Sequence, residues 1–353
     1  MKLNKVAFIL LFLLAGKLSA QHNELKKITL SAYGDFYYSY DFSNPQDHEK
    51  PNFIYNHKRH NEINTNLILL KANYLHKNTR GNLGFMAGNY AQYNLSAEPN
   101  WAQFIYEANM GVKLSQKQNI WLDVGIMPSH IGFESAISAD CWTLTRSILA
   151  ENSPYYETGL KVGYANKKEN LSVSFLVLNG WQKIQKTNFM QRPSFGIQAT
   201  FKPKENLIFN YSNFLGTDKP DRAASFRHFH NFYMQYEPTK SFGVTVGFDI
   251  GSDKNNRNDY GIWYSPVIIL RQSISNKTRV ALRGEYYNDK EQILISTRTA
   301  NGFQTLGLSS NLDYDITNKI RTRFECKLFK AKDPLFKNQH TNYSLTTNMT
   351  IRL

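Results

Sequence analysis

The sequence predicts an all-β protein: a transmembrane, antiparallel, up-and-down β-barrel of about 16 strands, with short turns at one end and long loops at the other. Three observations lead to this prediction. Apolar and polar residues alternate along most of the chain, short polar turns recur between the alternating stretches, and aromatic residues are abundant, with 21 Tyr, 23 Phe and 5 Trp. In such a barrel, alternate residues face lipid and water, and aromatic residues line both membrane interfaces.

The chain starts with the pattern of a leader. Lys2 and Lys5 precede an apolar stretch, VAFILLFLLAG, and small Ala20 ends the segment, as in a secretory signal peptide. We therefore expect residues 1–20 to be removed on export and residues 21–353 to form one barrel domain. No second apolar stretch of about 18 residues follows, so a helical membrane protein is not expected. Only residues 21–27 precede the first strand, so no plug domain is expected.

Period-two alternation identifies the strands in order. The first, ITLSAYGDFYYSYD (28–41), places Ile28, Leu30 and Phe36 on one face. The pattern recurs in stretches 107–115, 119–127, 171–177, 195–201, 242–250, 279–286 and 342–353. Charged residues lie between apolar ones, as Arg283 does beside Leu282, so one face of each strand is expected to be wet. The last strand is expected to pair with the first, because closure removes edges that lipid would not tolerate.

Turns and loops of two kinds separate these stretches. Short turns rich in Asn, Lys, Pro or Ser are expected at 76–79, 115–119, 166–170, 203–206, 238–241, 275–278 and 316–319. Longer connections are expected at 42–58, 94–102, 128–153, 183–191, 216–224, 252–258, 288–302 and 332–341. Seven turns and eight loops join sixteen strands and place both termini at the short-turn end. The stretch 288–302 is ambiguous, because QILIST could extend a hairpin or form strands of its own.

Several longer blocks resemble a known family. YGDFYYSYDF, NHKRHNEINTNL, YEANMGVKLS, IWLDVGIMPSHIGFESAIS, CWTLTRSILAENSPYYETGLKVGY and VLNGW together are similar to the OmpL-like beta-barrel porins of Gram-negative outer membranes. The resemblance is close over residues 30–182 and continues only as the barrel pattern after that. It implies an outer-membrane porin-like barrel. It implies no particular substrate and no catalytic residues.

The longest connection is the main candidate for a functional element. About sixteen strands enclose a lumen too wide for side chains to fill, so conduction depends on what narrows it. Loops as long as 128–153 are usually functional or disordered. Its apolar residues Ile137, Cys141, Leu144 and Ile148 have the spacing of a short helix. The charged candidates for a pore constriction are His130, Glu134, Asp140, Arg146 and Glu151. The alternative is an ordinary surface loop held by packing of Trp142.

Charged residues on the wet face are the second set of candidates. The lumen charge candidates are Lys113, Asp123, Arg279, Arg283, Glu285, Arg321, Arg323 and Glu325. With Lys161, Arg227, Lys327 and Arg352 counted against Asp35, Glu107 and Glu157, cations outnumber anions on the predicted inward faces. This excess predicts a weak anion preference. The alternative is that the charges pair across neighbouring strands and leave no net field.

Catalysis, metal binding and nucleic-acid binding are not expected. Asp47, His48, Glu49, His57 and His60 match no compact zinc spacing, and the pair His228 and His230 would bind a metal poorly, so we predict no cofactor and no metal site. No GxSxG elbow occurs, and adjacent Ser129 and His130 would point to opposite faces of a strand. A net charge of +14 alone does not indicate nucleic-acid binding without a basic helix or an aromatic–basic motif.

The sequence therefore predicts an outer-membrane porin through which small hydrophilic solutes diffuse passively. Its expected partners are outer-membrane lipid and these solutes, without nucleic acid. A homotrimer would be the usual arrangement, although no residue pattern identifies a subunit interface. Two alternatives stay open: a surface-binding protein that uses a barrel with an occluded lumen as its anchor, and an outer-membrane hydrolase.

Overall fold

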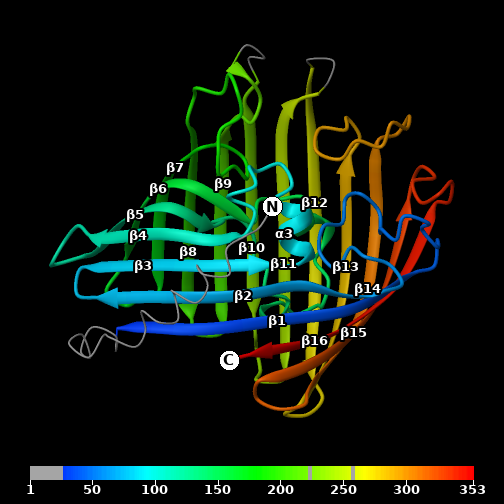
Figure 1. Ribbon diagram of the computed structural model, residues 1–353, viewed down its shortest axis with the longest axis horizontal. Coiled ribbons are helices and arrows are strands. Elements are labelled where there is room, and N and C mark those ends of the chain that lie inside the picture. Colours follow the sequence, from blue (N-terminus) through cyan, green and yellow to red (C-terminus); the bar gives the residue numbers. More distant parts are fainter. Residues whose placement is uncertain (1–26, 222–224, 256–258) are drawn as a thin grey trace, which may run out of the picture.

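The computed structural model describes residues 27–221, 225–255 and 259–353, and over these residues the chain forms a closed antiparallel barrel of 16 strands (Figure 1). The first eight are β1 (Ile28–Asp41), β2 (Ile63–His76), β3 (Thr79–Ala87), β4 (Ile105–Lys113), β5 (Asn119–Pro128), β6 (Tyr156–Ala165), β7 (Leu171–Leu178) and β8 (Ser194–Lys204). The second eight are β9 (Leu207–Gly216), β10 (Arg227–Tyr236), β11 (Phe242–Lys254), β12 (Tyr260–Ser273), β13 (Thr278–Asp289), β14 (Phe303–Asp315), β15 (Ile320–Ala331) and β16 (Thr341–Arg352). The predicted fold class is confirmed, whereas the predicted signal peptide, residues 1–20, lies outside the described residues.

Each strand pairs with its neighbours in sequence, and the last strand closes the barrel against the first. Tyr33 lies opposite Arg352 and Asp41 lies opposite Ser344 in the β1–β16 ladder. One register shift, between Asp35 and Phe36, interrupts the β1–β2 ladder. In Figure 1 the strands of the near wall, β1 to β5, run steeply across those of the far wall, β8 to β12, as expected for strands tilted about a barrel axis.

The predicted short turns are all hairpin connections, and both ends of the strand ladder lie at the short-turn end. The ambiguous stretch 288–302 is a loop: β13 ends at Asp289, β14 begins at Phe303, and no strand lies between them. The prediction was less accurate at the long-loop end. The connection predicted at 94–102 is longer, because it runs from β3 to β4 and contains the helix α3 (Asn89–Asn94).

Burial in the barrel is the inverse of that in a soluble protein. On β14, the apolar Leu306, Leu308 and Leu312 are 44 to 49% exposed, whereas Asn311 and Asp313 are at most 2% exposed. Exposed apolar side chains therefore form the outer face, and polar and charged side chains turn inward. A lipid solvent favours this arrangement, because apolar side chains can be exposed to lipid without a cost in free energy. Polar groups facing lipid would lack hydrogen-bond partners.

The inside of the barrel is filled by connections from the long-loop end. Strands β3 to β7 have only 8 to 10 residues each, so the loops between them begin deep in the wall. Two short helical elements occur in the connection between β5 and β6: the 3-10 turn η2 (Ser138–Asp140) and the single-turn helix α4 (Ile148–Glu151). The predicted helix over 137–148 is therefore wrong, because the backbone there bonds to the barrel wall instead. Among the described residues, no helix is long and apolar enough to cross a membrane.

Candidate pore constriction

Residues 129–155, between β5 and β6, cross the inside of the barrel and contact its opposite wall. Near its start, the carbonyl of His130 accepts hydrogen bonds from Gln198 on β8 and Ser212 on β9, each at 2.8 Å. Farther along, the Ser138 hydroxyl lies 2.9 Å from the Tyr33 hydroxyl on β1. The Trp142 ring lies 4.3 Å from the Arg271 guanidinium on β12. We call residues 131–153 the lumen segment.

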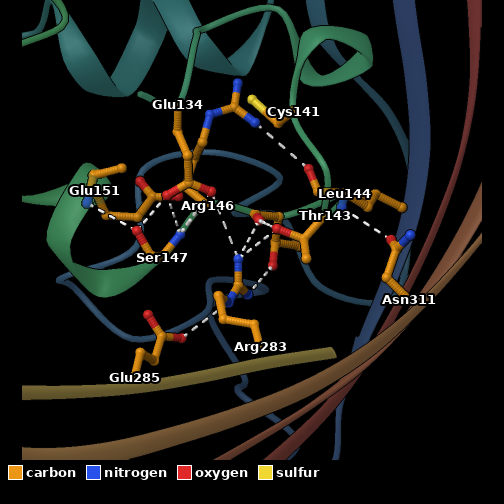
Figure 2. Close-up of polar contacts among 12 residues, drawn as sticks. Glu134, Cys141, Thr143, Leu144, Arg146, Ser147, Glu151, Arg283, Glu285 and Asn311 are labelled. Carbon is orange, nitrogen blue, oxygen red and sulfur yellow. Dashed lines mark hydrogen bonds and ion pairs between the residues drawn. The ribbon is translucent and has the colours of Figure 1, made fainter. Parts of the chain in front are cut away.

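Side chains of the barrel wall bind the backbone N–H groups of the lumen segment (Figure 2). The N–H of Leu144 donates to Asn311 at 2.9 Å. The N–H of Thr145 donates to Glu325 at 2.6 Å, and that of Ile148 donates to Glu285 at 2.5 Å. These three wall residues come from β14, β15 and β13. Because a backbone that crosses the barrel has no ladder partner, inward polar side chains must satisfy its buried donors.

Cations of the wall bind the carbonyl groups of the same segment. Arg323 donates to the Ser138 carbonyl at 2.7 Å and to the Cys141 carbonyl at 3.0 Å, while its Nε bonds Asp313 at 2.6 Å. Lys327 donates to the Arg146 carbonyl at 2.8 Å. The carbonyls are thus bound by cations, and the N–H groups by two carboxylates and one amide, on the same wall.

Arg283 on β13 is the centre of this contact. Its Nη1 donates to the Thr143 hydroxyl and the Thr145 carbonyl, both at 2.7 Å, and its Nη2 donates to Glu325 at 2.8 Å. Glu285 lies 3.4 Å from its Nε. The Arg283 side chain has no exposed surface. Its planar set of donors suits a site where several acceptors must be bound at once.

An apolar contact supplements these polar ones. Leu149 and Ala150 of the lumen segment pack against Val267, Ile269 and Ala281 of β12 and β13. Burying such side chains stabilises the docked segment by about 1.5–3 kcal/mol for each large one. The segment is therefore packed as a protein core and is not an ordinary surface loop.

The five predicted constriction residues lie in three places. Glu134, Arg146 and Glu151 lie together on the segment itself, where Glu134 accepts from the Ser147 N–H at 3.1 Å and Glu151 accepts from the Tyr55 N–H at 2.8 Å. The Arg146 guanidinium is fully buried, and its Nε and Nη2 have no hydrogen-bond partner within the part of the chain that the structure describes. Burial raises the pKa of the Glu151 carboxyl above its usual range.

The other two candidates lie apart from these three. Asp140 is exposed and pairs with Arg352 near the short-turn end of β16. His130 is buried where the segment leaves the wall, with Nδ1 2.7 Å from Glu157 and Nε2 2.7 Å from the Asn213 carbonyl. These five charges therefore do not lie together at one constriction, and whether they set ion preference stays a prediction.

The pair of His130 and Glu157 predicts a pH-dependent anchor. Burial opposes the charged imidazole, but the Glu157 carboxylate outweighs burial and raises the pKa of His130 above its ordinary value. A raised folded pKa gives stabilisation that is complete below pH about 6.5 and is lost as pH rises through the raised pKa. His130→Gln should therefore destabilise the protein by about 2 kcal/mol in acid and by less in alkali. Urea midpoints of both proteins at about pH 5.5 and about pH 9 measure this difference, and an equal loss at both pH values would contradict it.

The predicted lumen charges are largely paired. Arg279 and Arg321 both contact Asp315 at 2.6 Å, Arg323 pairs with Asp313, and Arg283 pairs with Glu325. Asp123 pairs with Arg80 at 2.5 Å. Several inward carboxylates of the barrel are not among the predicted lumen charges, namely Asp41, Asp249, Asp253, Asp289, Asp313 and Asp315. The inward face is thus less basic than predicted.

Two lysines differ from the other predicted lumen charges. Lys113 on β4 and Lys161 on β6 both lie on inward-facing positions. Among the described residues, neither has a carboxylate within ion-pair distance, since none of the ion pairs includes them. A small cationic excess therefore remains at the short-turn half of the wall formed by β4 and β6.

The first loop also enters the barrel, and no pattern in the sequence predicted this. His57, from the loop between β1 and β2, lies 3.1 Å from Asp35 of β1, and both side chains are fully buried. Asp35 also accepts from Ser138 at 2.8 Å and from Asn348 at 2.7 Å, which joins the first loop to the lumen segment. An isolated aspartate in a strand pattern gave no signal of these long-range partners.

The residues considered for metal binding or catalysis have other contacts. Within the described ranges, no three His, Cys, Asp or Glu side chains are grouped to hold a metal ion. His230 bonds the Tyr211 hydroxyl at 2.9 Å. The Ser129 hydroxyl donates to Glu157 at 3.1 Å, the same carboxylate that binds His130.

Comparisons with known proteins agree with the barrel. The anion-selective porin from Comamonas acidovorans superposes with a TM-score of 0.63 at 9% identity, covering 92% of this chain and 99% of that one. The outer membrane channel DcaP of Acinetobacter baumannii gives 0.60 at 10% identity, with 92% and 97% covered. The trimer form of OmpT, an outer membrane protein of Vibrio cholerae, gives 0.58 at 8% identity, with 92% and 99% covered. At these identities the likeness shows the fold alone.

The family comparison covers nearly the whole chain. A comparison with curated protein sequences finds no match. The family described as "Putative beta-barrel porin-2, OmpL-like" matches residues 27–353, which includes every strand of the barrel. The chain therefore belongs to the OmpL-like beta-barrel porin family and is an outer-membrane porin.

Proposed function

We propose that this porin lets small hydrophilic solutes diffuse passively across the outer membrane of a Gram-negative cell, to which residues 1–20 direct it as a signal peptide. The long-loop end would face outward and the short-turn end would face the periplasm. The observation that carries the proposal is the lumen segment, because a wide barrel needs an internal element to set its solute size. Barrel anchors that bind only at their surface have no such requirement.

Two cavities support a route past the lumen segment. A cavity of about 430 Å³ lies in the short-turn half against β2 to β6. A smaller one, of about 190 Å³, lies between the segment and the wall and is lined by Glu134, Tyr106 and Tyr155. Both are lined by Pro128. We propose that solutes pass along this wall, with Glu134 at the narrow part.

Lys113 and Lys161 are proposed to give the route a weak anion preference. Replacing both by Gln removes two positive charges that form no ion pair among the described residues, so the reversal potential under a salt gradient should shift towards that of an unselective pore. Lys290→Gln, in an exposed loop at the other end, is the matched control and should leave the reversal potential unchanged. A shift of equal size in the control, or cation preference in the unmodified protein, would contradict the assignment.

The main test of the function uses solutes of graded size. Proteoliposomes are expected to swell in small sugars, amino acids and organic acids, at rates that fall steeply with solute size. Planar bilayers should show discrete conductance steps. Liposomes that do not swell and bilayers without steps would favour the second candidate, a surface-binding protein anchored by an occluded barrel. The extensive contacts between the lumen segment and the wall are the observation that keeps this candidate open.

The proposal also includes an oligomeric state. We propose a homotrimer by analogy with the trimer form reported for the Vibrio cholerae protein, and sedimentation in detergent would test it.

The hydrolase alternative is disfavoured by the geometry around Ser129. Its hydroxyl bonds Glu157, and both ring nitrogens of His130 have other partners, so His130 has no free nitrogen to take a proton from Ser129.

A further inference from the structure

The cavity of about 430 Å³ in the short-turn half has an unusual lining. Its polar wall is made by Asn73 on β2, Asn82 on β3 and Asn109 on β4, together with the ion pair of Arg80 and Asp123. The three asparagines lie side by side on adjacent strands, since Asn73 is opposite Asn82 and Asn82 is opposite Asn109. We call these three residues the asparagine row.

The asparagines form a continuous chain of amide hydrogen bonds. Asn73 Nδ2 donates to Asn82 Oδ1 at 2.6 Å, and Asn82 Nδ2 donates to Asn109 Oδ1 at 2.8 Å. Asn109 Nδ2 then donates to the Ile126 carbonyl at 2.9 Å. Each side-chain amide has two N–H donors and two acceptor lone pairs, so each keeps unused donors and acceptors whichever way it is turned.

Apart from Lys161, the charged residues around the row form ion pairs within the wall. Arg80 binds Asp123 through two contacts, Nε to Oδ1 at 2.6 Å and Nη2 to Oδ2 at 2.5 Å. Lys71 binds Glu107 at 2.7 Å. Because these two carboxylates and two cations already satisfy one another, a charged solute would have to compete with a partner in place. Lys161 is the one lining cation without such a partner among the described residues.

We propose that the asparagine row and its cavity bind neutral polyhydroxylated solutes, that is, small saccharides. This inference rests on the proposed channel function and names the solutes that the channel would favour. A hydroxyl group is both donor and acceptor, and neighbouring strands place the amides about 4.8 Å apart. A solute with hydroxyls along its length can therefore bond several amides together. An apolar solute leaves the amides unpaired, and a charged solute meets only the single unpaired charge of Lys161 among the described residues.

Binding is tested on the full protein in detergent by saturation-transfer NMR, with sucrose as the probe and glutarate and hexanediol as charged and sparsely hydroxylated comparisons. Saturation transfer is expected for sucrose and should be much weaker for the other two. In Asn82→Ala the half-saturating sucrose concentration should rise about tenfold, the effect of losing one or two hydrogen bonds. Asn73→Ala, at the end of the row, should give a smaller rise.

Asn288→Ala is the matched control. Asn288 donates to the Tyr286 hydroxyl on β13, away from the cavity, so the same chemical change there should leave sucrose binding unaltered. Heat-modified migration on detergent gels identifies variants that retain the barrel. Equal binding of sucrose and glutarate, or unchanged sucrose binding in both Asn82→Ala and Asn73→Ala, would overturn the inference.

The outcome is separable from that of the channel function itself. Ionic conductance without sucrose binding would leave the porin function intact and would overturn only the assignment of solute class. Sucrose binding without conductance or swelling would support the site and would overturn passive diffusion. Current through the open channel gives a second measurement, because a bound saccharide in the route should reduce it in a saturable manner that Asn82→Ala weakens.

Discussion

Replacing residues 134–147 by a short glycine–serine linker is expected to raise the single-channel conductance several-fold. Together with His130, the lumen segment contacts β1, β8, β9 and β12 to β15, so this connection occupies most of the cross-section of the barrel. A barrel of 16 strands without an internal element has an aqueous lumen wide enough for hydrated solutes. The change should also raise the size limit for sugars in the swelling assay.

The matched control is a replacement of similar kind in a loop outside the lumen segment. Residues 291–301, between β13 and β14, lie at the long-loop end and line a different cavity from the two on the proposed route. Shortening that loop should change conductance little. If both replacements left the conductance of folded protein unchanged, the lumen segment would not be the constriction, and the narrow part of the route would have to lie elsewhere.

The barrel could be predicted from the sequence because its rules are local. Alternation with period two and hairpin turns depend on residues that are neighbours in the chain, and lipid imposes the same pattern on each strand. Hence the composition of 76–79 and 316–319 predicts turns there. The antiparallel pairing of the two strands on either side of each turn follows from the turn. Closure of β1 on β16 also followed, since membrane barrels have no free edges.

The inside of the barrel could not be predicted in the same way. The lumen segment was identified by its length and charges, but its contacts join residues more than a hundred positions apart, as between Thr145 and Glu325. The spacing of Ile137 and Leu144 suggested a helix, whereas wall side chains bind the backbone groups that a helix would have paired internally. The inward direction of Asp41 and Asp249 follows from local alternation, although the two were not counted. Ion pairs such as Asp313 with Arg323 on the next strand do not follow from it.

Arg283→Met is expected to reduce the free energy of unfolding by about 3–5 kcal/mol, because it leaves Glu325 buried without its paired cation and Glu285 buried with only Lys327. It also removes the donors that bind Thr143 and Thr145, so the lumen segment should detach and conductance should rise or fluctuate. Arg283→Lys keeps the charge but not the planar set of donors, and it should restore only part of the stability.

The control for this change lies on the same strand. Arg279 pairs with Asp315 at 2.6 Å, but its side chain is 22% exposed and makes no contact with the lumen segment among the described hydrogen bonds and ion pairs. Arg279→Met should therefore cost only about 0–1 kcal/mol and leave conductance steps unchanged. Urea unfolding followed by the mobility of folded and unfolded bands measures both losses. Equal losses of unfolding free energy in the two variants would mean that burial and contact with the lumen segment do not make Arg283 more stabilising than Arg279. The docked segment would then be held mainly by the packing of Leu149 and Ala150 on the apolar wall.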